Sequence, residues 1–315
     1  MVEKVIGWVL SGVIAVLGSM GLWFLSQPPR VSAPSGVFPN LMSKVALPID
    51  PKSVSPVPMA GDCDAGEKYR AAINELLANR REYDAWFEKA NTAVAAKPRA
   101  VELIAEASDC SKMTLFRKTP SEVITYDPEP ATLEAIQRLG EMTLQRGMLL
   151  RKTAPDEARH YLAAAFALGR HLFEERVAWR EFTAGVNLMV NASKYLAEIE
   201  PDPAKATYIQ NFAAAADKYK LDQLKLYGAI NTTDADLLRR HGGDAFALAR
   251  GSPEPMWRTS AILALGRMKY NTPLRGDQLA APRELKGWLN DTDPTTRAAA
   301  EAASNLTLEQ YRMLR

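Results

Sequence analysis

The sequence predicts an all-α protein with a single N-terminal transmembrane helix, an extended proline-rich connector and a soluble domain of stacked antiparallel helices. Three observations support this prediction. An uncharged apolar run lies near the N-terminus, prolines are concentrated directly after it, and beyond Cys63 apolar residues recur at helical spacing with no convincing strand pattern. The predicted units are an anchor (1–26), the connector (27–63), a helical bundle (64–231) and a region of paired helices (232–315).

The anchor is expected at residues 5–25. These 21 residues include no charged side chain, and at about 1.5 Å each they cross a hydrocarbon layer of about 30 Å. A cleaved signal peptide is the alternative, but its one candidate cleavage site, at residues 31–33, is followed by Pro34. Aromatic residues near both ends match the interfacial belts of a membrane helix: Trp8, Trp23 and Phe24.

One face of the predicted anchor carries small residues four positions apart: Gly7, Ser11, Ala15 and Ser19. Such a stripe lets a second helix approach closely and gain packing that lipid does not supply. We therefore expect the anchor to contact another membrane helix, either from a second copy or from a different integral membrane subunit.

Charge counting does not fix the orientation in the bilayer. Lys4 and the amino terminus on one side are matched by Arg30 and Lys44 on the other. The four-residue N-terminal tail and the two cysteines favour a C-terminal domain outside the cytoplasm. We expect a single-pass protein of a bacterial inner membrane with its C-terminal domain in the periplasm.

The connector contains eight of the chain's 20 prolines, so neither a long helix nor a central strand is expected there. It is too apolar for a solvated tether. We expect it to lie along a surface, either of its own helical domain or of a neighbouring subunit, although a plain linker is the alternative. The residues expected to contact that surface are Val37, Phe38, Leu41, Met42, Val45 and Leu47.

Beyond the connector, apolar spacing and turn signals predict helices at residues 68–96, a shorter helix ending near 108, and helices at 131–152, 156–175, 177–199 and 204–229. Each of the last four opens near a proline or a polar cap, as helix starts prefer. The helices at 156–175 and 177–199 are the most apolar, so we expect them to form the buried centre.

The C-terminal region contains an internal repeat. Residues 255–266 and 294–304 align when shifted by 39, and four pairs match: Pro255 with Pro294, Arg258 with Arg297, Ala261 with Ala300 and Ala264 with Ala303. Over residues 232–313 this pattern resembles HEAT repeats, which implies helical pairs whose first helices lie at 234–250 and 281–289. Two units are fewer than a free-standing array needs, so they must pack on the preceding helices.

The two cysteines, Cys63 and Cys110, invite a disulfide in an oxidising compartment; buried free thiols or a reactive thiol are the alternatives. There is a geometric objection to a disulfide. A helix of about 28 residues is much longer than its return of about 11 residues, which leaves the ends of a simple hairpin some 25 Å apart. The bond therefore needs the first helix to break, around residues 81–82, or the Cys63 loop to fold back along it.

The histidines do not form a recognisable metal or catalytic site. His160 and His171 lie in Glu-x-x-His and His-x-x-Glu patterns, but eleven residues separate them by about 16.5 Å along a helix, too far for one metal ion. We interpret both as hydrogen-bonding groups at helix interfaces. The segment His241-Gly-Gly-Asp244 is interpreted as a turn between helices, because no activated serine or cysteine motif accompanies its histidine and carboxylate.

Composition excludes several classes of function. The 315 residues include 39 basic and 37 acidic side chains, a net charge of +2, which supplies no large positive field for nucleic acid. The sequence has no P-loop, dinucleotide-binding, zincin or nucleophile-elbow motif, no C-x-x-C-H haem site and too few cysteines for a metal framework. We expect no cofactor, no metal, no catalytic residue and no small-molecule substrate.

The leading functional hypothesis is a non-catalytic scaffold or accessory subunit of a larger membrane complex, in energy-converting or envelope machinery. Its expected partners are integral membrane subunits and the lipid bilayer. One alternative is a periplasmic protein that binds a peptide or cell-wall fragment in a pocket lined by Trp179, Tyr195 or Tyr227. The other is an enzyme that lacks a recognisable motif.

Overall fold

The computed structural model describes residues 30–36, 50–55, 59, 61–88, 98–116, 130–176, 179–230, 235–252, 255–272 and 275–313. Within these ranges the chain is all-α apart from one small two-stranded sheet, which confirms the predicted class. No helix in these ranges is both long and apolar enough to span a bilayer. The predicted anchor at 5–25, with its small-residue stripe and interfacial aromatics, lies outside the described residues, as do the six apolar contact residues of the connector.

The N-terminal lobe, residues 61–116, contains the two strands that the sequence did not predict. Strands β1 (Gly61–Asp64) and β2 (Cys110–Lys112) pair in parallel. Between them lie three helices: α4 (Gly66–Ala78), α5 (Arg80–Glu88) and α6 (Arg99–Glu106). The single long helix expected at 68–96 is therefore interrupted at Asn79, whose N–H bonds back to the Glu75 carbonyl. The break lies two residues before the position suggested by the sequence.

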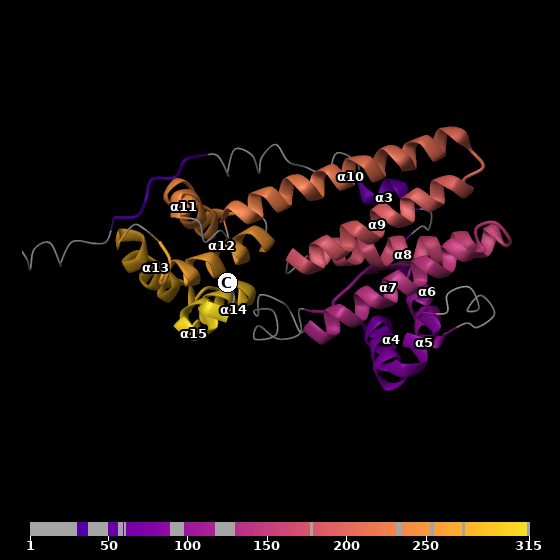
Figure 1. Cartoon of the computed structure of the whole chain (residues 1–315), viewed down its shortest axis with the longest axis horizontal. Coiled ribbons are helices and arrows are strands. Elements are labelled where there is room, and N and C mark those ends of the chain that lie inside the picture. Colours follow the sequence, from indigo (N-terminus) through magenta and orange to yellow (C-terminus); the bar gives the residue numbers. More distant parts are fainter. Residues whose placement is uncertain are drawn as a thin grey trace, which may run out of the picture.

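Four long helices follow and lie side by side in chain order (Figure 1). They are α7 (Pro130–Leu150), α8 (Pro155–Glu175), α9 (Trp179–Ile199) and α10 (Pro203–Ile230). Helices α8 and α9 form the buried centre, as expected, and residues 161–168 are all buried. These two helices approach so closely that a Cβ added to Gly169 would lie 2.7 Å from the Gly185 carbonyl oxygen. Only glycine allows this contact without a shift of the backbone.

The C-terminal region contains helices α11 (Ala235–Gly251), α12 (Pro255–Met268), α13 (Arg275–Trp288), α14 (Pro294–Asn305) and α15 (Leu308–Met313). Helix α12 contacts α11, α13 and α14, and one hydrophobic core runs from α8 and α9 through α10 into these helices. Helix α13 begins at Arg275 and contains Pro282, so the expected start at residue 281 is wrong. The Pro282 side chain is exposed and its neighbours Ala281 and Leu285 are buried, so the proline lies on the solvent side of a continuous helix.

Two described pieces of the connector lie against the chain's own helical domain. The short helix α3 (Pro51–Val54) contacts α10, where the Ser53 and Tyr208 hydroxyls are 2.8 Å apart and Val54 enters the core. Residues 30–36 lie beside α11 and α13 (Figure 1). The connector was expected to lie on its own helical domain or on a neighbouring subunit, and these two described segments lie on its own domain.

Candidate functional site

An extended segment docked on two buried carboxylates is the most specific polar arrangement in the described structure. We call residues 30–36 the strap. The backbone N–H of Ser32 donates to Asp277 Oδ1 at 2.8 Å, and the Ser32 hydroxyl donates to Asp277 Oδ2. Further along the strap, the Ser35 hydroxyl donates to Asp244 Oδ2 and the Gly36 N–H donates to Asp244 Oδ1 at 3.1 Å. The strap therefore presents one backbone N–H and one hydroxyl donor to each of the two carboxylates, on α13 and on α11.

Both carboxylates are buried completely, with 0% of each residue exposed. A buried carboxylate needs hydrogen-bond donors, because burial removes its hydration. Within the described chain, Ser32 supplies both hydrogen bonds to Asp277, which also lies in the first turn of α13, where the helix dipole favours a negative charge. Asp244 is also 3.4 Å from His241 Nδ1. Loss of the strap would leave Asp277 without its donors.

Glycines in the two helices allow the strap to approach. A Cβ added to Gly276 would lie 2.1 Å from the Arg30 carbonyl oxygen, and one added to Gly243 would lie 2.5 Å from the carbonyl oxygens of Ser32 and Ala33. Any larger residue at either position would therefore collide with the strap backbone. We call the surface formed by Gly243, Asp244, Gly276 and Asp277 the strap groove.

The position of the strap groove corrects one interpretation of the sequence. Residues 241–244 lie inside α11, so their interpretation as a turn between helices is wrong. Two adjacent glycines within a helical pattern signal a close backbone approach, and here that approach is made by the strap. The sequence does not show which segment approaches these glycines, because the strap is more than 200 positions away; Ser32 and Asp277, for example, are 245 positions apart.

The structure joins Cys63 and Cys110 in a disulfide, with their Cα atoms 4.8 Å apart. The parallel pairing of β1 with β2 brings the two cysteines together, and the interruption at Asn79 shortens the helix that posed the geometric objection. Cys63, Asp109 and Cys110 are also the one group within the described residues with the spacing of metal ligands. Disulfide sulfurs are not thiolates, so this group is not a metal site while the bond is intact.

His171 is buried beside this disulfide. Its Nε2 lies 2.8 Å from the Cys110 carbonyl oxygen, which only accepts, so Nε2 carries the proton and Nδ1 accepts from the Tyr69 hydroxyl, also at 2.8 Å. Burial is the main cause that lowers the pKa of His171 to about 4; the hydrogen bond to the Cys110 carbonyl opposes this shift and the positive charge of Arg170 adds to it. A neutral His171 thus links α4, α8 and β2, whereas His160 is exposed and packs edge-on against Tyr161.

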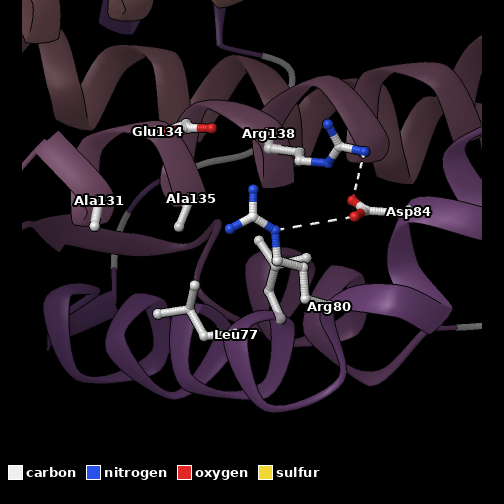
Figure 2. A pocket seen from close by; sticks show the side chains of 8 residues that line it. Leu77, Arg80, Asp84, Ala131, Glu134, Ala135 and Arg138 are labelled. Carbon is white, nitrogen blue, oxygen red and sulfur yellow. Dashed lines mark ion pairs between the residues drawn. The ribbon is translucent and has the colours of Figure 1, made fainter.

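A shallow pocket lies between α4, α5 and α7 (Figure 2). It holds about 400 Å³ including its open mouth, and Leu77 on its wall is 48% exposed. Figure 2 shows ion pairs from both Arg80 and Arg138 to Asp84, whose carboxylate lies 3.9 Å from Arg80 Nε and 2.8 Å from Arg138 Nη2. Because these charged groups engage one another, the pocket presents no activated acid, base or nucleophile among them.

The aromatic residues expected to line a binding pocket have other surroundings. Trp179 is 7% exposed, with its ring centroid 4.3 Å from Tyr227 and 5.0 Å from Trp257. The Arg151 guanidinium lies 5.5 Å from the ring centroid of Tyr195. Trp179 and Tyr227 therefore take part in the packing where α9, α10 and α12 meet.

No family model, curated protein or solved structure matches this chain. Function is therefore inferred from its own residues. Among these, the strap groove has the most specific geometry, since it fits an extended backbone that carries hydroxyl side chains three residues apart.

Proposed function

We propose that this chain is a non-catalytic scaffold or accessory subunit of a larger membrane protein complex. In this proposal residues 5–25 anchor the chain in a bacterial inner membrane, and the helical domain docks on partner subunits on the periplasmic side. The observation that best supports the proposal is the strap, which begins only five residues after the proposed anchor and is bound to the helical domain through two buried carboxylates.

A docked strap restricts the position of the helical domain relative to the membrane. A free connector of this length would let the domain move over distances on the order of 100 Å. The stretch from residue 25 to residue 30 reaches at most about 18 Å, so the α11–α13 end of the domain is held near the bilayer. Because the domain then loses less freedom when it binds, weak contacts with a neighbouring subunit become sufficient for docking.

The α-helical stack suits this role. Helical stacks of this kind present broad surfaces to partners, and the resemblance of residues 232–313 to HEAT repeats fits such a use.

The test is purification of the full chain in mild detergent, followed by identification of the proteins that co-purify. We expect integral membrane proteins in fixed stoichiometry. Replacing Ser11 and Ala15 by Leu should remove them without changing the unfolding of the helical domain, because the larger side chains block helix contact. Val9→Leu with Val13→Leu, on the opposite face of the predicted anchor, is the matched control. A clean monomer, or full retention of partners by the Ser11/Ala15 variant, would contradict the proposal.

A periplasmic peptide-binding protein is the second candidate, because the strap groove holds an extended backbone. In that case an added peptide with the sequence of residues 29–37 should displace the strap and accelerate tryptic cleavage after Arg30. The scaffold proposal predicts no acceleration, since the attached strap has a high effective concentration at the groove.

A further inference from the structure

We infer that the exposed face of α13 rests on the anionic headgroups of the bilayer in which the chain is anchored. This inference depends on the anchor in the proposed function and adds a second contact with the membrane. Three independent features of the described structure support it: the charge of the face, its exposed leucine and the position of Arg30.

The first feature is an unpaired basic surface. At about 100° per residue, one side of α13 carries five exposed residues within about 100° of its circumference. They are Arg275, Leu279, Pro282, Arg283 and Lys286. Within the described residues, none of the three cations on this face has an acidic partner. The acidic residues of the same helix are engaged elsewhere, Glu284 with Arg250 and buried Asp277 with Ser32.

The lysines of α10 provide a comparison within the molecule. Lys218 lies 2.7 Å from Asp222, Lys225 lies 3.5 Å from the same carboxylate, and Lys220 lies 2.8 Å from Asp217. The exposed surface of α10 is thus neutralised by its own acids, as is usual for a solvated helix. The face of α13 lacks this compensation, so it is complementary to an anionic surface.

The second feature is Leu279, which at 57% is the most exposed of the large hydrophobic side chains in the described structure. It lies between Arg275 and Arg283 along the helix. An apolar side chain surrounded by cations is the arrangement with which helices contact a membrane surface, since the leucine enters the headgroup region while the cations bind phosphates.

The third feature is the route of the chain. The Arg30 carbonyl oxygen lies 2.1 Å from where a Cβ on Gly276 would be, so Arg30 is directly against the first turn of α13. Residue 25, the last of the predicted anchor, is at most about 18 Å away along the chain. The membrane surface is therefore within reach of the same turn that begins the basic face. Anionic phospholipid headgroups are the partner that both the charge and this position favour.

The experiment uses the full chain reconstituted in lipid nanodiscs, with a fluorophore attached at Leu279→Cys. The native cysteines are bonded to each other and do not compete for the label. Leu221→Cys on α10 is the matched control, because Leu221 is 49% exposed among paired charges. The measurement is quenching by lipids that carry a quencher in the headgroup region, in discs of phosphatidylcholine with or without phosphatidylglycerol.

In discs with phosphatidylglycerol, quenching at position 279 should exceed that at 221 by about five-fold. It should fall when salt is raised from 0.1 to 1 M, which shortens the Debye length from about 10 to about 3 Å. It should also fall in Arg275→Gln/Arg283→Gln/Lys286→Gln, whose exposed substitutions leave the core intact. Equal quenching at both positions, in discs that contain the chain, would overturn this inference but leave the proposed anchor intact. Failure of the chain to enter discs would overturn the anchor, and the inference with it.

Discussion

The N-terminal lobe and the C-terminal paired helices satisfy their buried polar groups in different ways. The lobe is joined to helix α8, where Glu175 accepts from the backbone N–H groups of Leu115 and Phe116, and His171 links Tyr69 to Cys110 beside a disulfide. In the C-terminal region, Asp277 depends on Ser32, more than 240 positions away in the sequence. The lobe is therefore stabilised by its own disulfide and by side chains of the adjoining helix α8, whereas the C-terminal helices depend on residues 30–36, near the predicted anchor.

Removing the disulfide should produce the largest effect and confine it to the lobe. Its two cysteines are 47 positions apart, and closing a loop of that size contributes about 4 kcal/mol in the chain-entropy account of disulfides. The double variant Cys63→Ala/Cys110→Ala should lose about that much free energy of unfolding of the lobe in a urea titration. Tryptic cleavage after Arg30, which reports on the strap, should stay unchanged. A loss below about 1 kcal/mol would show that the lobe does not depend on the bond.

Acid should destabilise the lobe next most strongly through His171. Its pKa is about 4 in the folded chain, below the ordinary histidine value of 6.5, so between pH 4 and 6.5 the unfolded chain binds the proton more readily than the folded chain. The free energy of unfolding should therefore be highest above pH 6.5 and decrease as pH falls toward 4. The difference between the two pKa values corresponds to on the order of 3 kcal/mol.

The measurement is chemical denaturation between pH 4 and pH 7.5. His171→Gln should flatten the dependence over this window because it removes the titrating group, and His160→Gln, an exposed site on the same helix, should leave it unchanged. An unaltered slope in His171→Gln would assign the pH dependence to other groups.

Local signals in the sequence determined most of the helical fold. The predicted limits of α7 to α10 agree with the structure to within about two residues. Three of these helices begin at a proline, a residue favoured at the first position of a helix: Pro130, Pro155 and Pro203. Strands β1 and β2 have four and three residues, too short for a periodic pattern, and they exist through long-range pairing, for example of Gly61 with Cys110. The start of α13 was misplaced, because a solvent-facing proline inside a helix has the same local signature as one near a helix start.

The strap groove could be predicted only in part. The connector's composition predicts a segment that lies along a surface, and residues 30–36 do lie on the chain's own domain. The close approach at Gly243 was not predicted, because residues 241–244 were interpreted as a turn. Nothing local connects Ser32 with Asp277, since hydrogen bonds between such distant residues leave no mark on spacing or periodicity. Asp277 gives no distinctive signal either, because an Asp in the first turn of a helix is common.

Blocking the groove with a methyl group should release the strap while leaving its helices intact. Gly276→Ala places a Cβ 2.1 Å from the Arg30 carbonyl oxygen, and the nearest atoms it meets all belong to Arg30. Gly287→Ala in the same helix meets nothing within 4 Å and is the matched control. Both changes raise helix propensity by up to about 1 kcal/mol. Only Gly276→Ala should accelerate tryptic cleavage after Arg30, by about ten-fold if docking contributes 1–2 kcal/mol. Equal rates in both variants would show that the strap does not occupy the groove in solution.

The smallest expected effects, those of removing single hydroxyl groups, compare how strongly the two ends of the strap are held. Ser32→Ala removes one of the two hydrogen bonds to Asp277, both of which come from that residue, whereas Ser35→Ala leaves Asp244 with the Gly36 N–H and His241. We expect a loss of strap docking of about 1 kcal/mol for Ser32→Ala and less for Ser35→Ala, because a buried carboxylate deprived of donors costs more than one that keeps alternatives. Cleavage rates after Arg30 measure both losses.

A double-mutant cycle between Ser32→Ala and Asp277→Asn isolates the contact itself, since the strap's other bonds are common to all four chains. Strong coupling in this cycle, with none between Ser35→Ala and Asp277→Asn, would establish that Asp277 holds the strap through Ser32. A larger loss of docking for Ser35→Ala than for Ser32→Ala would instead place the stronger attachment at Asp244, farther from Arg30. The chain would then be held less firmly beside α13, and the basic face of α13 would be less strictly confined to the neighbourhood of the predicted anchor.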